Sequence, residues 1–296
     1  MARKISQEHL DAYLTGDFAT LLTVIKEDPE LSFDIRMNDE VKIYYNKGLV
    51  LTTKRCLKRK QHFTVTPLDK SYYKDANDKI KKKADALPNI QNVLNNKSKL
   101  EEYFKNAKDI VYFHAKDTEF TTQQYIALGN NSFDKRFVVV DMEWAYSQAD
   151  VNLSNRMPRT KIDLVIVDTV KNSKGVNDIY LAELKVGTGA KDGKSGIIAH
   201  VKKTNNIISD KNACASLKAD VESLIEQKTA LRLISGTPKQ LTLADKPKMM
   251  IIAAYRGNNE KIELEKGIQT AKEEANRLNM EEPVCIMYDC MIEIKL

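Results

Sequence analysis

Two neighbouring apolar segments that carry charged residues constrain this chain more than any other feature of its 296 residues. Residues 161–168 and 179–186 are short, rich in β-branched side chains and separated by a polar turn, which is typical of adjacent buried strands. Alternate residues of a strand share a face, so Asp163 shares its face with valines, and Glu183 and Lys185 share theirs with isoleucine and leucine. The sequence therefore predicts three ionisable groups on faces that should otherwise be apolar core.

Charges in such a place need partners, and two carboxylates close together need a cation to keep both ionised. We expect Mg²⁺, because it takes oxygen ligands and keeps several waters for chemistry, with Mn²⁺ as the alternative. In this interpretation Asp163 and Glu183 ligate the metal, and the main-chain carbonyl of Leu184 completes the shell. Lys185 then orients or activates a water, or offsets charge on a phosphoryl oxygen.

The arrangement resembles the PD-(D/E)xK phosphodiesterase superfamily, the restriction-endonuclease-like nucleases. Asp163 matches the lone carboxylate, and Glu183-Leu184-Lys185 matches the signature triplet at the end of the next strand. Ile162 departs from the pattern, because the name of the family places proline before the first acid. The resemblance covers about residues 117–255 and implies an αβββαβ core and metal-dependent hydrolysis of phosphodiester bonds.

Members of this superfamily commonly add a carboxylate from an upstream helix, and the resemblance assigns that place to Glu119. The alternative is an acidic residue that merely suits the first turn of a helix. Glu143, near the end of an apolar strand, is a rival as a metal ligand, unless it pairs with a lysine at the sheet rim. Asp141 is a weaker candidate, and Gln123 and Gln124 are candidates for supporting hydrogen bonds.

Positive charge gathers in the first third of a chain whose net charge is +6. Residues 41–60 hold seven lysines and arginines and no acidic residue, which fits a nucleic-acid surface and a solvated face equally well. On the helix after the triplet, His200 and two lysines are candidates for holding a phosphate, with an exposed helix face as the alternative. The candidate nucleic-acid-binding residues are Lys54, Arg55, Lys58, Arg59, Lys60, Lys202 and Lys203.

The pattern of segments predicts an α/β fold with a mixed β-sheet flanked by helices. Near the N-terminus, alternating runs separated by an Asn-Lys-Gly turn predict a small α+β domain. Its expected strands lie at residues 31–36, 41–45, 49–53 and 63–66. The predicted domains are a small α+β domain at 1–70, a helical connector at 71–116 and a nuclease-like domain at 117–296.

The remaining features bear on location and partners. The N-terminal residues lack the apolar segment of a signal peptide, and no run of eighteen apolar residues is present, so we expect a cytoplasmic protein without a membrane partner. The four cysteines are scattered, which suits reduced thiols. DNA is the expected substrate. The same fold as a non-catalytic binding or assembly module, and an RNA-directed nuclease, are the alternatives. Cleavage of both strands of a duplex would require two copies of the chain, so a homodimer is one possible assembly.

Overall fold

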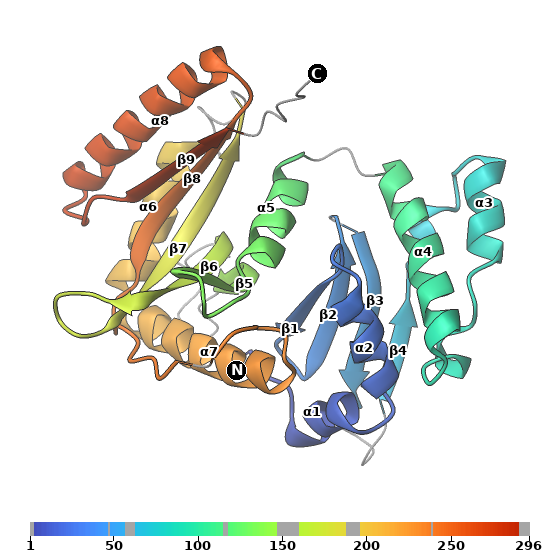
Figure 1. Cartoon of the computed structure of the whole chain (residues 1–296). Helices are drawn as coiled ribbons and strands as arrows, with labels where there is room; N and C mark the ends of the chain where they lie inside the picture. Colours follow the sequence, from blue (N-terminus) through green and yellow to red (C-terminus); the bar gives the residue numbers. More distant parts are fainter. Residues whose placement is uncertain are drawn as a thin grey trace, which may run out of the picture. The chain divides into compact units, whose positions relative to one another are not determined.

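The computed structural model describes most of the chain and divides it into two compact units (Figure 1). The first unit comprises Met1–Gly129 and Glu222–Ser235, and the second comprises Asn130–Val221 and Gly236–Leu296. The mixed α/β class predicted from the sequence is confirmed by the two sheets and eight α-helices of the described residues. These residues are 3–46, 48–56, 63–114, 118–146, 160–187, 196–237 and 239–289.

The first unit is built on a four-stranded antiparallel sheet in the order β1-β2-β3-β4, coloured blue in Figure 1. The turn from β1 to β2 contains Asn38 and Asp39, whose φ angles of 65° and 56° suit a tight hairpin turn between right-twisted strands. The predicted strand segments are present. The strands are β1 (Ser32–Arg36), β2 (Glu40–Tyr45), β3 (Gly48–Arg55) and β4 (Phe63–Pro67).

Helices of the first unit bury apolar stripes against this sheet. On α4, a buried stripe follows the 3.6-residue period, and it includes Leu100, Tyr103 and Phe104. The hydroxyl of Tyr103 donates to the carbonyl of Val50 over 2.7 Å, which ties α4 to β3. The helices are α1 (Gln7–Leu14), α2 (Ala19–Glu27), α3 (Asp78–Asp85), α4 (Lys97–His114) and α5 (Thr118–Gly129), with short 3₁₀ turns at Lys70–Tyr72 and Ile90–Asn92.

The second unit is built on a five-stranded mixed sheet in the order β5-β6-β7-β8-β9. The first three strands form an antiparallel meander, and β7, β8 and β9 are parallel, so helices make the crossovers between them. The strands are β5 (Phe137–Tyr146), β6 (Thr160–Lys171), β7 (Asn177–Val186), β8 (Lys248–Tyr255) and β9 (Val284–Asp289). The helices are α6 (Ile197–Ser209) and α7 (Lys211–Ala230) between β7 and β8, and α8 (Asn258–Arg277) between β8 and β9. The last part of α7, from Glu222 onward, belongs to the first unit.

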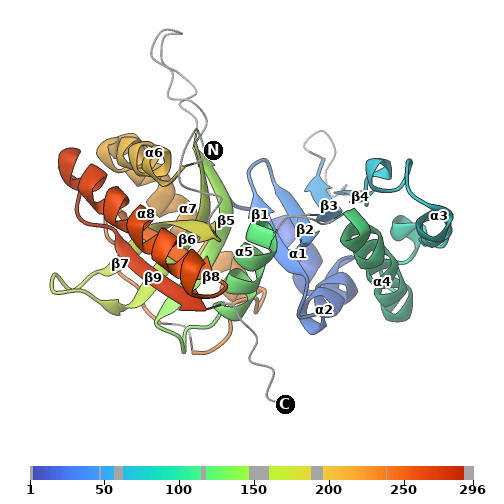
Figure 2. The same cartoon turned by 90° about the horizontal axis from the view of Figure 1, so that it is seen from above.

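Helices cover both faces of this second sheet. Figure 2 shows α6 beside α8, and both helices contact β8. On β5, the indole N–H of Trp144 donates to Asp220 of α7 over 2.9 Å. Trp144 pairs in register with Ile162, the neighbour of Asp163, so α7 contacts the face opposite to that of Asp163. The acidic residues of β6 and β7 therefore lie on the face that α6 and α8 cover.

The helix α5 belongs with the first unit. The side-chain amide of Gln124 donates to the carbonyls of Glu30 and Tyr44, over 2.8 Å and 3.2 Å. The boundary drawn from the sequence at residue 117 assigns this helix to the second domain instead. None of the helices in the described part of the chain has both the length and the apolar character that crossing a bilayer requires.

Candidate functional site

Asp163 and Glu183 lie where β6 and β7 stop pairing, at a point we call the β6–β7 fork (Asp163, Glu183 and Leu184). The paired residues of the two strands extend to Leu164 and Ala182, and the acids are the next residue on each strand. Beyond that pair, the N–H of Leu184 donates to the carboxylate of Asp163 over 2.9 Å instead of to a strand carbonyl. The two carboxylates therefore lie on the same face and are held directly across from one another.

Burial makes these charges expensive. Glu183 is fully buried and Lys185 is 3% exposed, whereas Asp163 is half-buried. Their neighbours on β8 are apolar, because Glu183 pairs with Ile251 and Lys185 with Ala253. The structure thus brings together the three residues that the sequence selected, in surroundings where an unpaired charge is disfavoured.

The pKa of Asp163 is raised to about 7. Burial is the largest cause, followed by the negative charge of Glu183, and a hydrogen bond with the Glu183 side chain adds to both. The N–H of Leu184 and the charge of Lys185 oppose this rise without cancelling it. Without a cation, the charge of Glu183 and burial therefore favour the protonated form of Asp163 below neutral pH.

The donor set at the fork fits a hard divalent cation. Two facing carboxylates supply oxygen ligands, and Mg²⁺ commonly uses only one or two carboxylates while it keeps several waters. Within the described ranges, no three His, Cys, Asp or Glu side chains gather as metal ligands, so a metal here would need main-chain and water oxygens as well. A main-chain carbonyl such as that of Leu184 remains the predicted additional ligand.

His200 of α6 contacts Glu183 directly. Its Nδ1 atom lies 2.7 Å from Oε2 of Glu183, and the histidine side chain is 13% exposed. From the sequence this histidine is only a candidate for holding a phosphate, because its contact with Glu183 depends on how α6 packs on the sheet. The signal that could have found the contact is the fully buried carboxylate itself, which needs a partner from the covering helix.

The two lysines that follow His200 differ from each other. Lys202 is exposed, and its Nζ lies 3.6 Å from Oε1 of Glu274, so it joins α6 to α8. Lys203 is half-buried. Their role in holding a nucleic acid stays a prediction.

Glu143 lies beside the fork in an unusual backbone conformation. It sits between Met142 and Trp144, whose partners on β6 flank Asp163, and its φ angle of 52° is rare for a residue with a side chain. Its carboxylate lies 2.8 Å from Nζ of Lys161, which is the rim pairing given above as the alternative. Its role as a metal ligand is not tested by this contact.

The remaining candidate residues belong to β5 and α5. Asp141 on β5 is buried, and its carboxylate accepts from the N–H of Met142 over 2.9 Å. Glu119 lies in the first turn of α5 in the first unit, with Gln123 and Gln124 on the same helix. The roles assigned to these side chains stay predictions.

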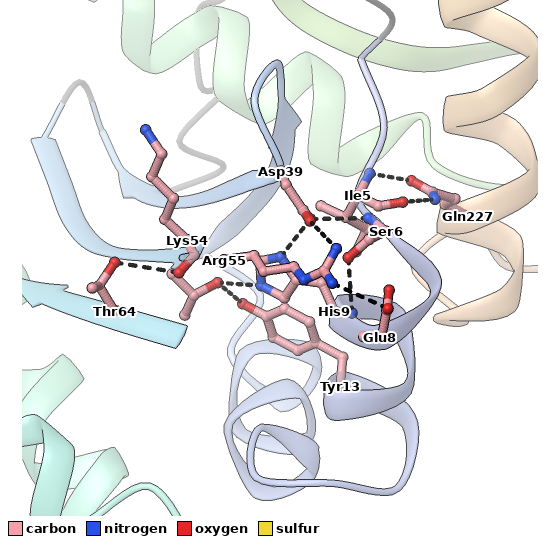
Figure 3. Close-up of polar contacts among 11 residues, drawn as sticks. Ile5, Ser6, Glu8, His9, Tyr13, Asp39, Lys54, Arg55, Thr64 and Gln227 are labelled. Carbon is pink, nitrogen blue, oxygen red and sulfur yellow. Dashed lines mark hydrogen bonds and ion pairs between the residues drawn. The ribbon is translucent and has the colours of Figure 1, made fainter. Parts of the chain in front are cut away.

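The basic residues of β3 in the first unit differ in their exposure and contacts (Figure 3). Lys54 is exposed, and its side chain points away from the polar network around Asp39. Arg55 points into that network, with its guanidinium 3.1 Å from Glu8 and 3.8 Å from Asp39. The remaining candidates, Lys58, Arg59 and Lys60, lie outside the described residues.

The same network contains a buried histidine with an acid and a hydroxyl on either side (Figure 3). Nδ1 of His9 lies 2.9 Å from Asp39, and Nε2 lies 3.0 Å from Thr53 Oγ1, which is 2.7 Å from the Tyr13 hydroxyl. Burial raises the pKa of Asp39, but the hydrogen bonds from His9 and Ser6 outweigh it and hold that pKa below its usual value. Because Thr53 is fully buried, this order of groups fixes α1 to the sheet and offers no nucleophile to a substrate.

A cavity of about 780 Å³ lies at the other end of β7 and β8 from the fork. Lys248 in its lining pairs with Asp178 and Glu281, over 3.1 Å and 3.0 Å, and Lys218 pairs with Asp245 over 2.7 Å. Much of the charge in this cavity is therefore neutralised by neighbours within the protein.

Comparisons with known proteins give no match that bears on the site. No protein-family model matches the chain, and no curated protein and no solved structure matches it either.

Proposed function

We propose that this chain is a divalent-metal-dependent phosphodiesterase of the PD-(D/E)xK type, which cleaves nucleic acid, with DNA as the expected substrate. One observation carries the proposal. Two carboxylates, of the half-buried Asp163 and the fully buried Glu183, face one another at the β6–β7 fork, with the ammonium-bearing Lys185 one strand step beyond.

A purely structural role accounts poorly for this set of residues. A salt bridge needs one acid and one base, and a second buried acid adds repulsion, as the raised pKa of Asp163 reflects. Apolar residues of similar size often stabilise a core as well as or better than a buried ion pair. A cation that lets both carboxylates ionise gives a reason for keeping them.

The arrangement of elements supports the same proposal. The antiparallel strands β5, β6 and β7, followed by α6 and then by β8 parallel to β7, have the order that the resemblance implies for its core. The acids lie near the carboxyl end of β7, where the chain leaves the sheet toward α6. In sheets with parallel strands, ligand-binding and active sites commonly lie at the carboxyl ends of the strands.

Each residue has a distinct part in the proposed reaction. Asp163 and Glu183 would hold Mg²⁺, which supplies a polarised water and a Lewis acid for the phosphoryl oxygen. Lys185, which is buried and whose charge acts on Asp163, would orient the attacking water and offset the charge that develops on the phosphoryl group. The apolar neighbours on β8 keep bulk water from screening these interactions.

The proposal is tested by incubating the full chain with circular and linear DNA, single-stranded and double-stranded, and with RNA, in Mg²⁺, Mn²⁺ or EDTA. Metal-dependent products that disappear in Asp163→Asn and Lys185→Ala support it, and the substrate that is cut separates DNA from RNA. A matched control is Asp168→Asn, a buried acid on the same strand that pairs with Arg136 at 3.0 Å. Intact substrates that nonetheless shift in a gel would favour the binding module.

A further inference from the structure

We infer that His200 is a positioning residue for the metal centre, which holds the Glu183 carboxylate in the orientation that a cation requires. This inference rests on the proposed function. The contact that carries it is a close approach of opposite groups, in which Nδ1 of His200 lies 2.7 Å from Oε2 of Glu183, in ion-pair geometry and not in the alignment of a hydrogen bond.

The place of the hydrogen on the ring follows from the chemistry of the two groups. An ionised carboxylate carries no hydrogen, so Nδ1 must carry one for an approach of 2.7 Å to be favourable. Because Glu183 is fully buried, the histidine occupies a place that water would fill at an exposed carboxylate. The contact restrains one oxygen of Glu183, while the pair with Asp163 engages the same side chain from the opposite strand.

The helix that carries His200 is anchored well enough to fix the ring. On α6, Ile197, Val201 and Thr204 are buried, and Thr204 lies one turn beyond His200 on the same helix face. The ion pair from Lys202 to α8 adds a second attachment. A donor held by a packed helix positions its acceptor more tightly than a donor on a loop does.

The geometry assigns His200 to the support of a ligand, not to the metal itself. Its Nδ1 atom lies against a carboxylate oxygen, and within the described segments no third His, Cys, Asp or Glu completes a metal-ligand cluster with the acidic pair. Outer partners of this kind orient ligands, and their removal commonly weakens metal affinity about 10- to 100-fold.

Three substitutions at His200 separate positioning from mere packing. The amide nitrogen of asparagine is as many bonds from Cα as Nδ1 of histidine, whereas the amide nitrogen of glutamine is one bond farther, in the place of Nε2. The variant His200→Asn therefore keeps a donor at the position that contacts Glu183. His200→Gln and His200→Ala lose that donor, and His114→Ala, at an exposed histidine of α4, is a matched control.

The experiment is calorimetric titration of the metal-free full chain with Mn²⁺, repeated with Mg²⁺, together with thermal unfolding of each variant. We expect His200→Ala and His200→Gln to lose about 10- to 100-fold in metal affinity, and His200→Asn to stay within about threefold of wild type. Wild-type affinity in His200→Ala, or equal losses in the asparagine and glutamine variants, would overturn the inference alone. A wild-type chain that binds neither ion would overturn the metal centre and the inference with it.

Discussion

The main-chain N–H of Leu184 donates to the carboxylate of Asp163 over 2.9 Å, at the place where strand pairing between β6 and β7 ends. This hydrogen bond to a side chain takes the place of a main-chain hydrogen bond between the two strands. As a result, a main-chain hydrogen bond holds Asp163 of β6 opposite Glu183 of β7. Glu183 cannot move along the sheet without breaking this contact.

The stability of the metal-free protein should depend on pH through Asp163. Its pKa is near 7 in the folded chain and near 3.8 in an unfolded one, so the folded chain retains a proton that the unfolded chain loses. Between these values the free energy of unfolding should therefore fall as the pH rises, by about 1.4 kcal/mol for each pH unit. Urea unfolding over this pH range measures the slope, and Asp163→Asn should lack it. An unchanged slope in that variant would assign the titration to another group.

Substitutions of Lys185 and of Glu183 should affect cleavage and metal binding differently. Lys185→Ala removes a positive charge but no oxygen ligand, so we expect cleavage to fall by about 100- to 1000-fold while Mn²⁺ affinity is kept or rises. Glu183→Gln should lose both. Single-turnover cleavage and calorimetry on the same preparations make the comparison, and a parallel loss of metal affinity in Lys185→Ala would mean that the lysine supports the carboxylates instead of the reaction.

The buried network of the first unit should affect stability alone. Thr53→Val removes the hydroxyl that lies between His9 and Tyr13, and leaves two buried polar atoms without this partner. We expect a loss of about 1–3 kcal/mol in the free energy of unfolding, with metal-dependent cleavage unchanged. Thr64→Val, at an exposed position of β4, is the control. A loss of cleavage in a folded Thr53→Val protein would contradict the structural assignment.

The sequence predicts local features of this protein well. The strands of both sheets follow from short apolar runs and turn residues, and the placement of Asp163, Glu183 and Lys185 on one face follows from the two-residue period of a strand. These inferences need only neighbours in the chain. The mixed character of the second sheet follows in the same way, from strands separated by helical segments.

Contacts between distant segments could not be predicted in this way. The pairing of His200 with Glu183 depends on the docking of α6, and the left-handed backbone of Glu143 depends on how β5 pairs with β6 on either side of it. The association of α5 with the first unit depends on Gln124 reaching two carbonyls that are far away in sequence. Periodicity and motif spacing carry no information on such contacts, because tertiary packing decides them.

Lys54 and Arg55 allow a last test, because they are adjacent in sequence but differ in their contacts. Lys54 is exposed and points away from the network, so Lys54→Ala should weaken binding to DNA and reduce the dependence of log affinity on log salt by about one, without loss of stability. Arg55 is held by Glu8 and Asp39, so Arg55→Ala should instead cost on the order of 1 kcal/mol of stability. Fluorescence anisotropy of labelled DNA at several salt concentrations, paired with urea unfolding, measures both effects. If Lys54→Ala leaves the salt dependence unchanged, this strand does not contact the phosphate backbone.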